Sequence, residues 1–153
     1  MKKLLLSVLV ALFAVTAFSQ TASEIEIMQR SFALDKMQIV AAYVSPSEEH
    51  IAPFIDVYEE YELKRMELGK ERIALLNEYA ENWDGMTNEQ AEAWMKKVLD
   101  LRKKTDKLID TYYTKVKKAT DAKTATQFYQ VELYILTTVR YALFETIPFV
   151  GEK

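Results

Sequence analysis

The chain has 153 residues, of which 50% are hydrophobic and 28% are charged, so it can form one folded domain with its own core. Its net charge of −3 at pH 7 argues against a nucleic-acid partner, and the absence of cysteine excludes disulfides and thiol chemistry. Only three glycines and three prolines are present, and so few helix breakers favour long helices over a many-stranded sheet.

Residues 1–19 have the organisation of a secretory signal peptide. Two lysines precede an apolar run over 4–18, and small residues lie before the expected cleavage point between Ser19 and Gln20. An uncleaved anchor is the alternative, but this run is shorter than the ~20 residues that span a bilayer. We therefore predict a periplasmic protein whose single domain is 20–153, with no stable membrane insertion after cleavage.

Two helices are predicted in the first half of this domain. Apolar residues recur at three- and four-residue steps over 23–42, which indicates the first helix. The second is predicted over 45–82, with Ser45 as its N-cap and Pro46 at its first position. Pro53 lies inside the pattern and predicts either a kink or a late helix start.

A turn over 82–85 separates the second helix from the third. Thr87 and Gln90 form a capping box at the start of this third helix, which carries a regular apolar stripe between charged residues. The short turn predicts that the two helices, each about 45–55 Å long, form an antiparallel hairpin. The second helix is mainly acidic and the third mainly basic, which favours their pairing.

The fourth helix is predicted from a cap at Thr120 or Asp121 to about residue 145, before Pro148. Apolar residues lie on two of its faces, so it is either the most buried helix or one whose second face meets a partner. The predicted fold class is all-α: an elongated four-helix protein built on a long antiparallel helical hairpin.

The sequence offers no arrangement of residues for catalysis, for a cofactor or for a metal. His50 is the single histidine, so neither a Ser-His-Asp triad with its Gly-x-Ser-x-Gly turn nor a di-iron bundle is indicated. The methionines are scattered, which favours core packing over a soft-metal site. We predict a protein that binds other proteins and is not an enzyme; a metal-binding sensor is the least favoured class.

Two groups of side chains are candidates for contact with a client or partner protein. The first consists of aromatic and aliphatic residues on the faces of the hairpin, which either form the core or leave an apolar strip open. The second consists of lysines on the third helix, which either face the acidic helix or rim a binding surface. The candidates are Ile51, Phe54, Ile55, Tyr58, Tyr61, Tyr112, Tyr113, Lys103, Lys104 and Lys107.

Three segments carry a family resemblance. Residues 86–90, Met-Thr-Asn-Glu-Gln, match the motif Leu-Thr-x-x-Gln with Met in place of Leu, whereas 44–48 lack its Thr and Gln. Residues 51–61 and 123–132 are similar to the helices that follow such motifs. The chain thus resembles the Spy/CpxP-like periplasmic proteins, in particular Bacteroidetes-type members.

This resemblance implies one of two functions. The first is an ATP-independent chaperone that binds unfolded proteins. The alternative is an envelope-stress sensory or adaptor module that binds one specific membrane regulator. Either function makes unfolded or other envelope proteins the expected partners. The family's cradle-shaped dimers add a second copy of the chain as a candidate partner.

Overall fold

The computed structural model describes the backbone of residues 22–152, and the side chains of residue 29 and of 32–152. The described residues form four helices, α2 (Ala22–Tyr43), α3 (Glu48–Asn82), α4 (Asn88–Ala119) and α5 (Ala122–Thr146), and contain no strand. The all-α prediction is therefore confirmed. The predicted signal peptide falls outside the described residues. None of the described helices is both long enough and apolar enough to span a membrane.

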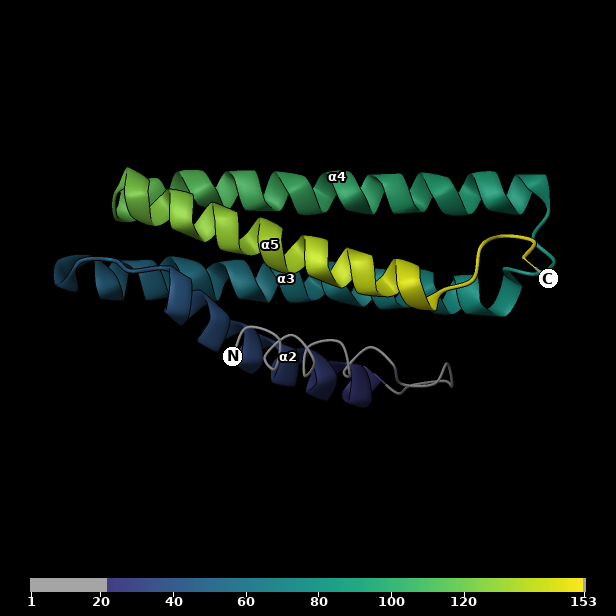
Figure 1. Cartoon of the computed structure of the whole chain (residues 1–153), viewed down its shortest axis with the longest axis horizontal. Helices are drawn as coiled ribbons and strands as arrows, with labels where there is room; N and C mark the ends of the chain where they lie inside the picture. Colours follow the sequence, from purple (N-terminus) through teal and green to yellow (C-terminus); the bar gives the residue numbers. More distant parts are fainter. Residues whose placement is uncertain (1–21, 153) are drawn as a thin grey trace.

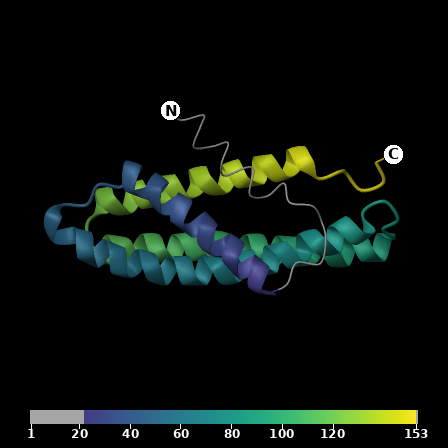
Figure 2. The same cartoon turned by 90° about the horizontal axis from the view of Figure 1, so that it is seen from below.

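The helices α3 and α4 form the predicted antiparallel hairpin, with 35 and 32 residues respectively, and α5 lies beside α4 (Figure 1). The helix α2 crosses α3 and α5 obliquely, as the view in Figure 2 makes clear. The C-terminal segment closes on the turn of the hairpin, where the Gly151 N–H donates to the Trp83 carbonyl and the Tyr79 hydroxyl donates to the Pro148 carbonyl.

Charge complementarity supports the hairpin along its length. Three ion pairs join a lysine of α4 to a glutamate of α3, at N–O distances of 2.7 to 2.8 Å. They pair Lys97 with Glu78, Lys104 with Glu71, and Lys115 with Glu60. Each exposed pair adds at most about 1 kcal/mol, so they set the partner and register of the helices more than the stability of the fold.

The helix starts agree with the sequence at two positions and differ at one. Thr87 and Gln90 form the capping box of α4, and Asp121 caps α5. The N-cap of α3 is Ser47 and not Ser45. The Ser45 N–H donates to the Gln127 side chain of α5, which keeps Ser45 in the link between α2 and α3. The helix continues through Pro53. Pro53 lacks the N–H that would donate to the Glu49 carbonyl, so it costs the helix one backbone hydrogen bond.

The core joins all four helices. Phe128 of α5 meets Tyr61 of α3 edge to face, with ring centres 5.2 Å apart at 86°, and the Tyr61 ring lies 5.3 Å from Tyr112 of α4 at a tilt of 59°. The buried apolar cluster consists of Phe32, Ile39, Val40, Val44, Phe54, Tyr58, Tyr61, Ile109, Tyr112, Val116, Ala125, Phe128, Val131, Ile135, Leu136 and Val139. Because α2 contributes residues to this cluster, its inward face packs against α3 and α5.

Candidate functional site

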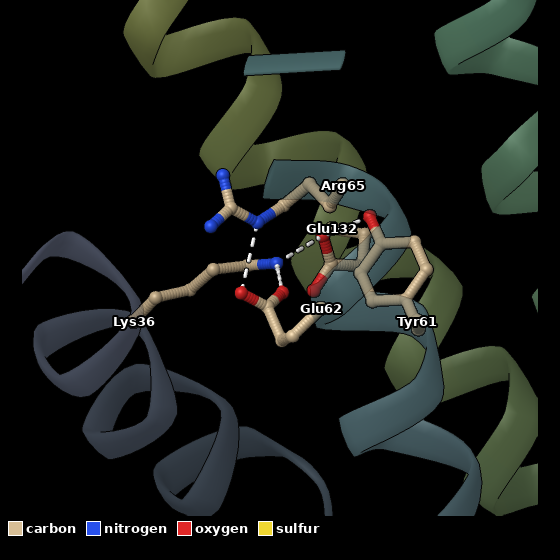
Figure 3. Close-up of polar contacts among 5 residues, drawn as sticks. All are labelled: Lys36, Tyr61, Glu62, Arg65 and Glu132. Atoms are coloured by element: carbon tan, nitrogen blue, oxygen red, sulfur yellow. Dashed lines mark hydrogen bonds and ion pairs between the residues drawn. The ribbon is translucent and has the colours of Figure 1, made fainter. Parts of the chain in front are cut away.

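A cluster of charged side chains is buried where α2 meets α3 and α5 (Figure 3). The ammonium group of Lys36 is fully enclosed; it pairs with Glu62 of α3 and, at 2.8 Å, with Glu132 of α5. The Arg65 Nε donates to Glu62 at 2.8 Å, and the Tyr61 hydroxyl donates to Glu132 at 2.6 Å. Two cations thus face two carboxylates, which is the balance that a buried ionic cluster requires.

The electrostatic environment shifts the pKa values of the two carboxyl groups in opposite directions. Burial raises the pKa of Glu132, against the opposing effect of Lys36. Burial acts in the same direction on Glu62, but the charges of Lys36 and Arg65 outweigh it and lower the pKa of that group. Burial also raises the pKa of Tyr61, as does the neighbouring Glu132 carboxylate. At neutral pH the phenol therefore stays protonated and serves as a hydrogen-bond donor and not as a base.

A partly enclosed cavity of about 80 Å³ adjoins this cluster. All four helices line it, and its walls are mainly apolar side chains such as Ile109, Ile135 and Val139. Polar atoms also reach it: both amide atoms of Gln29, one terminal nitrogen of Arg65 and one oxygen of Glu132 are buried without a hydrogen-bond partner. Buried polar atoms of this kind ordinarily have partners, so their concentration at one cavity is unusual.

Gly69 fits the approach of α2 to this cavity. A Cβ atom at this position would come within 2.7 Å of the Gln29 Nε2 atom. Glycine inside a helix costs about 1 kcal/mol relative to alanine, and here the missing side chain leaves the space that the Gln29 amide occupies.

Four of the predicted binding residues are not on the surface. Phe54, Tyr58, Tyr61 and Tyr112 are between 1 and 7% exposed and belong to the core, so an apolar strip made of these side chains is wrong for this structure. The physical reason is that α5 packs against the hairpin and buries its inward face, which the Tyr61–Phe128 ring contact illustrates. The alternative that these aromatic residues form the core is the one that holds.

The remaining apolar candidates are accessible to different degrees. Ile51 and Ile55 are more than 40% exposed near the start of α3. Tyr113 is half-buried, with its ring packed edge to face on Tyr129 of α5 at 5.8 Å. Ile51 and Ile55 therefore remain available for contact with a partner, whereas Tyr113 mainly joins α4 to α5.

The three candidate lysines are exposed but differ in their partners. Lys104 pairs with Glu71 across the hairpin, and Lys103 lies 3.9 Å from Asp100 on its own helix. Lys107 is exposed. Lys104 thus faces the acidic helix, as one of the two interpretations of these lysines expects. The side chains of Lys103 and Lys107 are exposed to solvent.

The clearest exposed apolar surface lies on α5. We call it the α5 strip; it consists of Leu133, Tyr134, Tyr141 and Phe144, which are 37 to 67% exposed. These residues share one side of the helix with Gln130 and Thr137. Charges occur on this side only near its ends, at Lys123 and at Glu145, which accepts a hydrogen bond from the Tyr141 hydroxyl. The sequence indicated this face through the second apolar pattern of the fourth helix.

No metal site is evident in the part of the chain that the structure describes, where no three His, Cys, Asp or Glu side chains are grouped suitably for an ion. His50 lies in the first turn of α3, with its Nδ1 atom 3.0 Å from the Ser47 hydroxyl and 3.4 Å from Asp121.

Sequence reasoning missed the buried ionic cluster, although a signal for it existed. Lys36 falls one helical turn from Phe32 and from Val40, on the apolar side of α2. Glu132 lies in the same way between Phe128 and Leu136. A charge on an apolar stripe indicates a buried partner of opposite charge.

The described residues define an all-α fold of four helices with a buried ionic cluster and an outward helix face that is mainly apolar. Comparison of the chain with protein-family models, with curated proteins and with solved structures finds no match.

Proposed function

We propose that this protein binds apolar segments of other proteins in the cell envelope, in the manner of an ATP-independent chaperone for unfolded clients. The observation that carries the proposal is the α5 strip. An outward helix face on which apolar side chains recur from Leu133 to Phe144, with charges only near its ends, is uncommon on a solvent-exposed helix and favours a surface that a partner covers.

The rest of the surface argues for α5 in particular. The outward side of α4 carries exposed charged residues such as Lys96, Asp100 and Lys103, which keep that helix hydrated. Near the N-terminal end of the α5 strip, Tyr134 and Tyr43 of α2 line a common depression of the surface. A client segment with aliphatic or aromatic side chains would gain its affinity from burial of these rings.

The experiment is an aggregation assay without nucleotide, in which the protein is added to several unrelated, chemically unfolded clients. The test variant combines Tyr141→Ser with Phe144→Ser. The control is Leu63→Ser, because Leu63 has the same exposed fraction as Phe144, 67%, but lies on α3 among charged residues. All three changes affect exposed side chains, so the fold should persist, which far-UV circular dichroism verifies.

We expect the protein and the Leu63→Ser variant to suppress aggregation at near-stoichiometric ratios, and the double variant to lose most of this effect. Equal activity of the double variant would contradict the role of the α5 strip. No suppression with any client, together with capture of one specific membrane protein, would favour the adaptor alternative. A stable dimer that the double variant disrupts would assign the strip to a second copy of the chain.

A further inference from the structure

The geometry points to a second binding site, independent of the α5 strip: the cavity among the four helices accepts a small carboxylate with a short apolar body. The Gln29 amide and the Arg65 guanidinium would hold the carboxylate, and the aliphatic wall of α4 and α5 would enclose the body.

The polar atoms at the cavity are the first line of support. Gln29 is 6% exposed, and neither atom of its amide has a hydrogen-bond partner. The Arg65 side chain uses its Nε for Glu62, whereas its terminal nitrogen Nη2 is buried and unpartnered. These two donors can both serve a carboxylate, which accepts several hydrogen bonds and pairs well with guanidinium.

The charges around the cavity are the second line of support. Arg72 also lines it, and the guanidinium groups of Arg65 and Arg140 act on Arg72 with a charge of the same sign. Burial and these two like charges lower the pKa of Arg72, against the opposing effect of the Tyr61 phenol. An incoming anion would offset the like charges.

The remaining acceptor determines what else the ligand can carry. Glu132 is 2% exposed, with one oxygen engaged by Lys36 and Tyr61 and the other, Oε1, unpartnered at the cavity. A ligand hydroxyl next to the carboxylate could donate to this oxygen. A hydroxylated acid should therefore bind at least as tightly as the plain acid of the same length.

The volume limits the size of the ligand. A cavity of about 80 Å³ lies between the roughly 30 Å³ that one water occupies and the roughly 150 Å³ that accepts benzene. Acetate, glycolate, propionate and acrylate, with four or five non-hydrogen atoms each, are ligands of this scale, with a short body that the walls would shield from water.

Two variants test the site without endangering the fold. Gln29→Leu replaces the unpartnered amide by an apolar group of similar size, and Gly69→Ala places a methyl group within 2.7 Å of the Gln29 amide while improving helix propensity. The matched control is Gln38→Leu, which changes an exposed glutamine on the same helix. Circular dichroism and the melting temperature of each variant without ligand establish that the fold is kept.

Binding is measured with the four carboxylates at millimolar concentrations by thermal shift and calorimetry, with propionamide as the uncharged counterpart of propionate. We expect the carboxylates to raise the melting temperature of the protein and of Gln38→Leu, with binding about tenfold weaker in Gln29→Leu and in Gly69→Ala, as for loss of a hydrogen bond to a charged group. The side-chain amide resonances of Gln29 should shift on titration.

Three results would overturn the proposal. The first is the absence of any shift or heat with all four carboxylates, which would mean that the cavity takes up water only. The second is equal binding of propionate and propionamide, because the site would then not recognise charge. The third is unchanged binding in Gln29→Leu, because the carboxylate would then be held elsewhere.

Discussion

Replacing Lys36 by methionine keeps the length and apolar stem of the side chain and removes its charge. In the protein the ammonium group is fully enclosed and is the contact that Glu62 and Glu132 share. Glu62 retains Arg65 in the variant, and Glu132 retains only the Tyr61 hydroxyl. The variant thus leaves one carboxylate, that of Glu132, buried without a cation.

Removal of one partner of a buried ion pair costs about 3–5 kcal/mol. We expect the lower end, near 3 kcal/mol, because burial already raises the pKa of Glu132 and the carboxyl group can take up a proton when its cation is lost. With a urea dependence of about 2 kcal/mol per molar, the unfolding midpoint should fall by roughly 1.5 M.

The assay is equilibrium unfolding in urea, followed by circular dichroism at pH 7. Lys103→Met serves as the control, because the Lys103 side chain is 80% exposed and its loss should change stability by no more than about 0.5 kcal/mol. The double variant Lys36→Met, Glu132→Gln should recover most of the loss, since it leaves no unpaired charge and keeps an acceptor for the Tyr61 hydroxyl. A cost below 1 kcal/mol for Lys36→Met, or no recovery in the double variant, would refute this account.

Two further predictions concern single side chains. The raised pKa of Glu132 means that folding favours its protonated form, so the contribution of this group to stability falls as the pH rises above 4.5, its ordinary pKa. Urea unfolding should therefore show that Glu132→Gln gains stability relative to the unmodified protein between pH 4.5 and pH 7. A difference that stays constant over this range would contradict the prediction. Thr87→Ala removes the acceptor for the Gln90 N–H and should cost about 1 kcal/mol in the same measurement, whereas an unchanged midpoint would show that the cap is dispensable.

The fold was predictable because its signals are local. The capping box at Thr87 and the cap at Asp121 need only residues within one turn of each helix, and both were identified from the sequence. The start of α3 was misplaced for the opposite reason. Ser45 is bound to Gln127, 82 positions further along the chain, and no local pattern contains that contact.

The binding residues were less predictable, because periodicity identifies a face but not what covers it. Phe54, Tyr58 and Tyr61 share the predicted face of α3, but α5 packs over it and places all three in the core. The exposure of Tyr141 and Phe144 follows from the same packing, since α5 turns its other apolar side outward. Which side of an amphipathic helix remains free depends on tertiary contacts alone.

The ionic cluster and the cavity are coupled through α2. Lys36 and Gln29 both belong to this helix and both line the cavity, and Lys36 also binds the carboxylates of α3 and α5. A ligand that contacts Gln29 can be held fully only when α2 is docked, so its binding would stabilise the docked helix by the linkage between binding and conformation. By the same reciprocity, a change that removes the contacts of Lys36, and so weakens the docking of α2, should lower the affinity for the ligand. Lys36→Met would then lower carboxylate affinity even though Gln29 and Arg65 are unchanged.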